Sequence, residues 1–306
     1  MNIQALPYVI LTGFSFGSSL IAARFAIDQF TPITYVNLRL LLASLCFLLI
    51  YVLNKRRHPW PTSSRLWRHG LVLGVVSTAI PMLAFVMALQ YLSSGVTSVL
   101  NTSGPALTII LAHFFLPDES LTQRKSVGVA LAFAGAILLA LRGESGLAAV
   151  EQANPLGYIL VLIGLTSVSG STIYARKFAR DLSSFDITSS QIFIGTAVLL
   201  PITLMQGGFD VSQVNGQGYF VLVYGAIIGT VLAFLLFFHL ISRFGATATA
   251  MVPYIVPVVA TLGGLLLLDE TLTWGTVAGM LIIGLGIAIL NSQGRKSRIR
   301  GFLWRQ

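Results

Sequence analysis

A few polar side chains lie inside long apolar stretches of this sequence, and their types could support chemistry. His113 and His239 carry imidazoles, the side chains that exchange protons near neutral pH. They are candidates for a proton relay, although hydrogen bonds or an interfacial position would also explain them. Arg39 lies about two turns into another stretch, where we expect it to pair with backbone carbonyls or to reach the polar edge. The ten acidic residues fall between the stretches or at their ends, so no carboxylate is expected deep inside.

Hydroxyl, amide and aromatic side chains recur in the same stretches and predict a cavity for a small molecule. Ser167, Ser171 and Tyr174, for example, share one helical face. The candidate cavity residues are Phe16, Ser19, Thr78, Met82, Phe85, Asn101, Thr108, Ser167, Ser171, Tyr174, Tyr224, Phe234, Phe238, Thr249 and Tyr254. We expect no catalytic residue, no metal ligand and no cofactor.

Four prolines interrupt the apolar stretches. A proline inside a helix frees a backbone carbonyl and bends the helix, and such breaks often line the cavities of membrane proteins. We therefore predict hinges at Pro81, Pro105, Pro253 and Pro257, with simple packing kinks as the alternative. Pro105 and Pro257 are expected to be an equivalent pair.

The composition determines which kind of protein positions these residues. Of the 306 residues, 55% are hydrophobic and only 9% are charged, whereas a soluble domain carries about 25% charged residues. This excludes a soluble enzyme, a disordered chain and, despite the net charge of +9, a nucleic-acid-binding protein. The single cysteine, Cys46, excludes an intrachain disulfide. The predicted fold class is an all-α polytopic membrane protein.

Ten apolar segments are long enough to cross a bilayer, whose core needs about 20 residues per helix. Short links at 92–94 and 241–244 predict that the third and fourth spans, and the eighth and ninth, form hairpins. We expect the cavity between spans 1, 3, 4, 6, 8 and 9. The predicted spans are 7–27, 33–53, 70–90, 95–117, 124–142, 155–175, 187–206, 217–240, 246–268 and 273–291.

Basic residues give the expected orientation of these spans. When the connections are numbered alternately from the N-terminus, one set holds 16 of the 19 Lys and Arg residues and the other holds two. Loops rich in Lys and Arg stay in the cytoplasm. We therefore expect both termini in the cytoplasm.

The chain contains an internal repeat. The segment 118–122, Asp-Glu-Ser-Leu-Thr, is echoed by 269–273, Asp-Glu-Thr-Leu-Thr, and a pair of glycines follows each segment at the same offset. We expect the paired acids to cap the helices that follow them. The predicted domains are a five-helix repeat at 1–150, a second repeat at 151–291 and a basic cytoplasmic tail at 292–306.

Five spans per repeat is an odd number, so the second repeat should enter the membrane in the opposite orientation. Such an inverted repeat has a twofold axis in the membrane plane, and its halves can exchange shapes. The repeat therefore predicts a transporter that works by alternating access.

Several motifs also resemble a known family. They are Phe16-Gly17, Pro32 with Arg39, Pro105 followed by Leu116-Pro117-Asp118-Glu119, and Pro257 followed by Leu268-Asp269-Glu270 with Gly279 and Gly286. In this order the sequence resembles the drug/metabolite transporter superfamily, specifically the ten-span EamA-type exporters, and most of all the bacterial amino-acid exporters. The resemblance implies export of a small metabolite across the inner membrane of a bacterium.

The missing deep carboxylate favours a neutral or zwitterionic substrate, such as an aromatic or other hydrophobic amino acid, moving down its gradient. Proton-coupled export of other metabolites or drugs is the first alternative. An intramembrane protease is a weaker one, because Gly143-Glu144-Ser145-Gly146 lies in a connection, and a channel is disfavoured because nothing resembles a selectivity filter. The expected partners are the small-molecule substrate and the lipid bilayer, with the protein a monomer or a homodimer.

Overall fold

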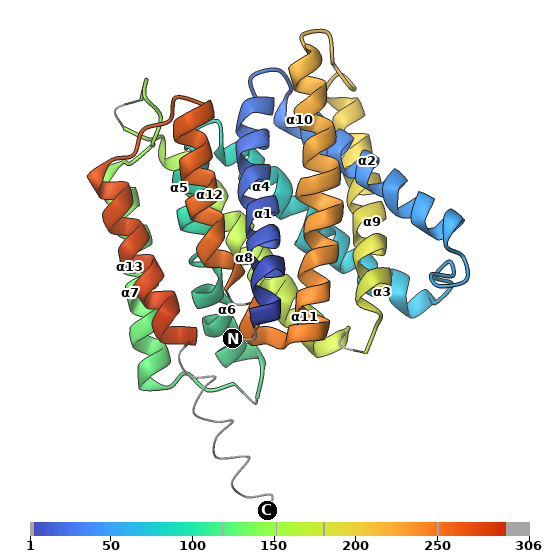
Figure 1. The fold of residues 1–306 in the computed structure, drawn as a ribbon, viewed down its shortest axis with the longest axis horizontal. Helices are drawn as coiled ribbons and strands as arrows, with labels where there is room; N and C mark the ends of the chain where they lie inside the picture. The colour runs from blue at the N-terminus through green and yellow to red at the C-terminus, as the bar shows by residue number, and fades with distance from the viewer. Residues whose placement is uncertain (1–2, 118, 151, 180, 250, 292–306) are drawn as a thin grey trace, which may run out of the picture.

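The computed structural model describes residues 3–291 except 118, 151, 180 and 250, and within helices it leaves the side chains of residues 3, 238, 241, 242 and 245–247 undescribed. The predicted tail at 292–306 lies outside the described residues. The described chain is a bundle of helices that run up and down between two edges (Figure 1). The all-helical fold predicted from the sequence is confirmed.

Seven of the predicted spans agree with the structure to within a few residues at both ends. In order, the elements are η1 (Ile3–Ala5), α1 (Leu6–Ala26), α2 (Pro32–Leu53), α3 (Ser64–Leu73), η2 (Gly74–Ala79), α4 (Ile80–Ala88), α5 (Ser94–Asn101), α6 (Gly104–Phe115), α7 (Gln123–Arg142), α8 (Pro155–Phe178), α9 (Ser184–Met205), α10 (Gly216–Ala226), η3 (Ile227–Leu232), α11 (Ala233–Thr249), α12 (Val252–Leu267) and α13 (Trp274–Asn291). Within the described chain, nine helical segments are long and apolar enough to cross a membrane, and α12 is a shorter apolar helix.

Side-chain caps explain where many of these helices begin. A hydroxyl or amide oxygen at the residue before the helix accepts a hydrogen bond from a free N–H of the first turn. Residues that cap in this way are Thr31, Ser63, Ser93, Thr122, Asn154, Ser183 and Asn215. Thr273 likewise accepts from the backbone N–H of Thr276 at the start of α13, at 3.0 Å.

The caps correct one expectation from the sequence. Thr122 and Thr273 cap α7 and α13, whereas we expected the paired acids to do so. Glu270 instead reaches across the fold and accepts from the backbone N–H of Ser94 at 2.7 Å, at the start of α5. Glu119 pairs with basic side chains, and Asp118 lies outside the described residues.

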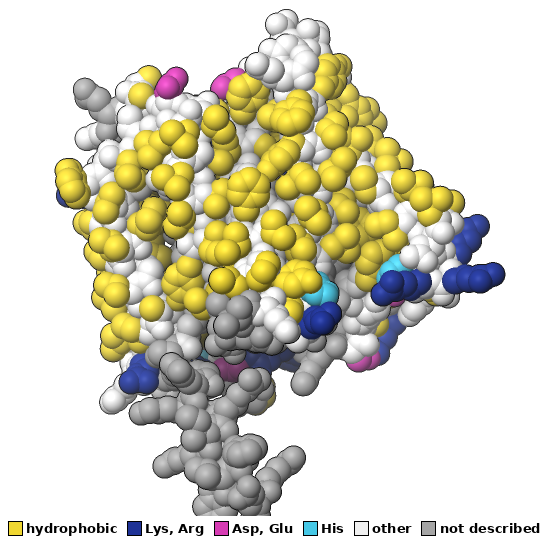
Figure 2. All heavy atoms as spheres, viewed as in Figure 1, with side chains coloured by type: hydrophobic (Ala, Val, Ile, Leu, Met, Phe, Trp, Pro, Cys, Tyr) yellow, Lys and Arg dark blue, Asp and Glu magenta, His cyan; other side chains and the backbone are white. Residues whose placement is uncertain are grey.

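The outer surface of the bundle is apolar. Figure 2 shows a broad yellow field of hydrophobic side chains across the face, with most Lys and Arg side chains near the lower edge. Large side chains such as Leu53, Leu266 and Trp274 are 76%, 80% and 87% exposed, while many Ala, Ser and Thr residues are buried. Large residues outside and small ones inside are typical of helices packed within a bilayer.

Glycines bring α7 and α13 into close contact. A Cβ added to Gly128 would lie 2.8 Å from the Gly286 carbonyl oxygen, and one added to Gly135 would lie 3.0 Å from the Gly279 carbonyl oxygen. Gly128 and Gly135 are the sequence equivalents of Gly279 and Gly286. Exchanging the two halves of the chain therefore converts the Gly128–Gly286 contact into the Gly135–Gly279 contact. Only residues without a Cβ allow this approach of two backbones.

Two helix breaks occur in the middle of the bundle, before Pro105 and Pro253. Proline has no N–H and its ring clashes with the carbonyl four residues earlier, which ends the preceding helix. The residues four earlier are Asn101 and Thr249, the last residues of α5 and α11. The hydroxyl of Thr102 donates to the Pro253 carbonyl at 3.4 Å, so the two breaks touch.

The breaks correct two predictions. The prediction of a link at 241–244 is wrong, because α11 continues through these residues to Thr249. The equivalent pair of breaks is Pro105 with Pro253, and Pro257 lies inside α12. Pro257 cannot donate to the Pro253 carbonyl, which leaves that oxygen free for Thr102. The link near 92–94 is present between α4 and α5.

Candidate substrate cavity

A cavity of about 630 Å³ lies between the two halves of the chain. It is bounded by α1, η2, α4, α5, α6 and α8, by Gly229 of η3, and by α11 and α12, and one residue of α2 reaches it. The wall is mostly apolar, with hydroxyl and amide groups set into it. Among the residues that line it are Ser77, Ser98, Thr102, Gly104, Leu165, Val168, Thr172, Phe237, Val252 and Val256.

Many of the candidates from the sequence lie in this wall. Aromatic rings meet on one side, where the Phe16 ring lies 6.0 Å from the Phe234 ring and 6.1 Å from the Phe237 ring, both nearly edge-on. The candidates that line the cavity are Phe16, Ser19, Thr78, Met82, Phe85, Asn101, Thr108, Phe234, Pro81, Pro105 and Pro253. The side chain of Phe238 lies outside the described residues.

Other candidates lie outside the wall because their polar atoms are used elsewhere. Ser171 donates to the Val168 carbonyl of its own helix, the Tyr174 hydroxyl bonds His69, and the Tyr224 hydroxyl donates to Ser18. Thr249 is buried at the end of α11. Tyr254 and Pro257 line a separate apolar cavity of about 290 Å³, beside α13.

Ser167 supports the π-helical segment η2. In a π-helix each N–H bonds the carbonyl five residues earlier, and Pro81 has no N–H to give to the carbonyl of Val76. The Ser167 hydroxyl donates to that carbonyl at 2.5 Å. Ser167 therefore supports the cavity wall without lining it, whereas the sequence predicted that it lines the cavity.

The π-helical segments η2 and η3 were not predicted. They occupy equivalent places in the two halves, and both contribute to the cavity. Single π-helical turns are rare and are found mostly at functional sites. Their sequence signal is weak, since both segments read as continuous apolar helix.

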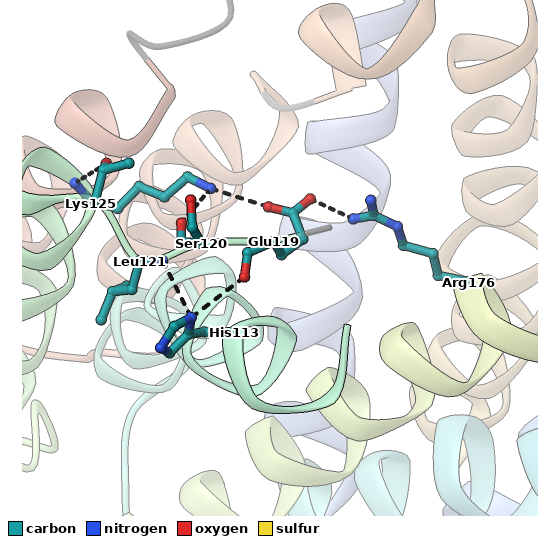
Figure 3. A network of polar contacts seen from close by, with 7 residues as sticks. His113, Glu119, Ser120, Leu121, Lys125 and Arg176 are labelled. Carbon is teal, nitrogen blue, oxygen red and sulfur yellow. Dashed lines mark hydrogen bonds and ion pairs between the residues drawn. The ribbon is translucent and has the colours of Figure 1, made fainter. Parts of the chain in front are cut away.

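Neither candidate for a proton relay lies in the cavity wall. His113 is exposed at the end of α6, where its Nδ1 contacts the backbone of Glu119 and Leu121 at 3.4 and 3.3 Å (Figure 3). His239 packs against the rings of Tyr8 and Phe244. Neither imidazole is among the groups that line the cavity.

Figure 3 also shows Glu119 between two cations from different helices. Its carboxylate accepts from Arg176 of α8 at 2.7 Å and from Lys125 of α7 at 3.1 Å. The Arg176 hydrogen bond, and secondarily Lys125, hold the pKa of the Glu119 carboxyl below its ordinary value against the opposing effect of burial. This cluster ties the α6–α7 connection to the end of α8.

Arg39 lines the cavity, although the sequence did not place it among the cavity candidates. Its side chain is only 7% exposed, and its Nε donates to the Thr230 hydroxyl at 2.8 Å. One terminal nitrogen donates to the Gly229 carbonyl at 3.1 Å. The expected pairing with a backbone carbonyl is therefore present, but the guanidinium also lines the cavity. Where a buried arginine points depends on the packing of distant helices.

The cavity wall holds no carboxylate among the described residues, and Arg39 is its one charged side chain. Among the same residues, no three of His, Cys, Asp and Glu come together where they could hold a metal ion. The arrangement suits reversible binding of a molecule with an apolar body and a polar end.

Comparisons with known proteins agree with the fold. A solved crystal structure superimposes with a TM-score of 0.66 over 97% of this chain and 100% of the other, at 17% identity. An uncharacterized transporter of Archaeoglobus fulgidus is 26% identical over 92% of this chain and 96% of that protein. Protein PecM of Dickeya dadantii is 25% identical over 90% of this chain and 89% of that protein.

A further relative is the uncharacterized inner membrane transporter YedA of Escherichia coli, which is 26% identical over 84% of this chain and 80% of its own length. The model of the EamA-like transporter family matches residues 4–141 and, separately, residues 155–292. This chain is therefore a multi-pass membrane protein that belongs to the EamA-like transporter family.

Proposed function

We propose that the protein exports small neutral or zwitterionic metabolites, chiefly hydrophobic or aromatic amino acids, across a bacterial inner membrane by alternating access. The observation that carries the proposal is the cavity between the two touching helix breaks, with walls from both halves of the chain. Its volume of about 630 Å³ accommodates an amino acid, and its aromatic wall suits an apolar side chain.

Two observations support an inverted repeat. The family model matches the chain twice, once in each half. The glycine contacts between α7 and α13 are unchanged when the halves are exchanged, as a twofold axis between them requires. An inverted repeat can take two related shapes, each open to one side.

At the upper edge in Figure 1, hydrogen bonds between the two halves close the bundle above the cavity. Glu270 accepts from both the backbone N–H and the hydroxyl of Ser94, and Thr271 donates its N–H to the Gly146 carbonyl at 2.8 Å. At the lower edge the halves are joined by more exposed contacts, the ion pairs of Glu119 with Arg176 and of Arg65 with Asp181. Exposed ion pairs contribute little to stability, so these contacts are easier to break. This difference supports a cavity that opens toward the lower, basic edge, which the distribution of Lys and Arg assigns to the cytoplasm.

The test is counterflow in proteoliposomes loaded with unlabelled leucine or phenylalanine. The purified protein should accumulate the labelled amino acid saturably and without an imposed proton gradient, since the described wall holds no carboxylate for coupling. No saturable uptake above empty liposomes for any hydrophobic amino acid would overturn the proposed substrate class.

A matched pair of variants on α8 locates the path. Thr172 lines the cavity and Thr166 is exposed on the same helix, and each hydroxyl donates to a carbonyl of its own helix at 2.8 Å. Thr172→Trp should fill the cavity and reduce counterflow about tenfold or more, because a bulky ring in a pocket removes the substrate's contacts. Thr166→Trp should transport like the parent, and equal loss in both variants would refute this path.

A further inference from the structure

The unusual feature of the cavity is a buried arginine without a counter-ion. Arg39 is 7% exposed and makes two hydrogen bonds to neutral groups, although a guanidinium has five N–H donors. Among the described residues no carboxylate pairs with it. A buried charge is costly unless it is paired, and such residues inside a membrane protein commonly mark the path of a substrate.

The equivalent position in the other half shows that packing alone does not require the charge. Arg39 is the eighth residue of the 22-residue helix α2, and Gln191 is the eighth residue of the 22-residue helix α9. Each helix packs against the π-helical segment of the other half. Gln191 lies against η2, where its backbone carbonyl would be 3.0 Å from a Cβ on Gly74. An uncharged residue thus serves at the same kind of contact.

The surroundings of Arg39 supply a second group for an anion. A Cβ on Gly229 would lie 2.5 Å from the Ser19 hydroxyl and 3.1 Å from a terminal nitrogen of Arg39, so both side chains border the same glycine. Ser19 lines the cavity. On the same face of α1, one turn away, Phe16 meets the rings of Phe234 and Phe237. A polar corner therefore adjoins an aromatic wall.

We infer that Arg39 and Ser19 form a carboxylate subsite, and that the substrates are monocarboxylates with an apolar body whose amino group is dispensable. The inference rests on the proposed export function and names the substrate group that the cavity recognises, which extends the substrates to acids without an amino group. The guanidinium provides charged N–H donors in the planar arrangement that a carboxylate accepts. A substrate ammonium has no described carboxylate in the wall to pair with, so binding energy should come from the acid end.

The test uses four ligands with the same phenyl ring: phenylalanine, 3-phenylpropanoate, phenylalaninamide and phenethylamine. The first two carry a carboxylate and the last two do not. Binding to the purified protein is measured by titration calorimetry and by ligand-induced thermal stabilisation. We expect the two acids to bind at least about tenfold more tightly than the amide and the amine, as for a charge-assisted hydrogen bond.

Three variants connect this preference to the subsite. Arg39→Gln introduces the residue found at the equivalent position. It should weaken the binding of both acids about tenfold or more and leave the binding of the amide unchanged. Ser19→Ala should weaken the acids by a smaller factor. Arg65→Gln removes an exposed charge that pairs with Asp181 far from the wall, and it should bind like the parent.

The outcomes separate this inference from the proposed function. Equal binding of acids and amide by the parent protein, or an Arg39→Gln variant that keeps the acid preference, overturns the carboxylate subsite and leaves export of neutral metabolites standing. Binding of phenylalanine but not of 3-phenylpropanoate also overturns it, because the amino group is then required. If none of the four ligands binds, both the carboxylate subsite and the proposal of aromatic substrates are overturned. The preference of the parent protein decides the matter even if Arg39→Gln does not fold.

Discussion

At the scale of single residues, proline decides the local structure of the cavity. Pro105 and Pro253 end the helices before them, while Pro81 and Pro257 leave the carbonyls of Val76 and Pro253 without a backbone donor. The hydroxyls of Ser167 and Thr102 donate hydrogen bonds to these two carbonyls. Within the membrane an unpaired carbonyl is costly, so these two carbonyls are stabilised by hydroxyl donors from distant parts of the chain.

Glu119 is the residue whose protonation should affect stability. Its pKa is lowered by Arg176 and Lys125, so the folded state favours the carboxylate. The stabilisation is present above the unfolded value of about 4.3 and is lost as the pH falls through the lower folded value. Thermal unfolding in detergent should show Glu119→Gln less stable than the parent at pH 7, with the difference shrinking as the pH falls below about 4.3.

Asp28→Asn is a suitable control, because Asp28 pairs with Arg24 in an exposed position and such pairs contribute little. A Glu119→Gln deficit that stays constant from pH 7 to pH 3 would show that the carboxylate's charge is irrelevant.

At the scale of elements, the approach of α7 and α13 depends on the glycines between them. A Cβ on Gly286 would lie 2.6 Å from the backbone nitrogen of Ala132, which cannot rotate away. A Cβ on Gly284 of the same helix would meet nothing within 4 Å. The two helices therefore offer a matched pair of positions two residues apart.

Gly286→Ala should destabilise the fold by about 1–3 kcal/mol, the usual cost of overpacking, despite alanine's better helix propensity. Gly284→Ala should leave stability unchanged or raise it by up to about 1 kcal/mol. Unfolding temperatures of both variants in one detergent check this. Equal stability of the two would mean that α7 and α13 can move apart freely.

The two breaks are the elements that should bend during transport. With alanine at position 105 or 253 the missing N–H returns, and α5–α6 or α11–α12 can become one straight helix. Pro105→Ala and Pro253→Ala should therefore slow counterflow several-fold while changing substrate affinity by less than about twofold.

Pro201→Ala is the control for this prediction, because Pro201 lies inside α9, is exposed and does not line the cavity. Parent-like turnover in both break variants would show that the transport cycle does not use these breaks as hinges.

At the scale of the whole molecule, the distribution of charge predicts the orientation in the membrane. The connection between α2 and α3 is strongly basic, and the connection between α9 and α10 at the opposite edge has no Lys or Arg. Loops of the first kind remain in the cytoplasm.

Single cysteines test this in a Cys46→Ala background. Asn54 and Gln213 are exposed residues in these two connections. A membrane-impermeant maleimide should label Gln213→Cys in intact cells and Asn54→Cys only after the cells are opened. The reverse pattern would contradict the orientation and place the open side of the cavity outside.

The sequence alone determined the helical membrane fold and nearly all span ends, because hydrophobic length and capping residues act locally. It also pointed to residues of α1, α4 and α5 in the cavity wall, such as Phe16, Met82 and Asn101, because helical spacing limits which residues share a face. Only the tertiary structure decided the positions of Arg39, Ser167 and Glu270. Each of these side chains bonds a group far away in the chain, at η3, η2 or α5, and local patterns carry no information about such contacts.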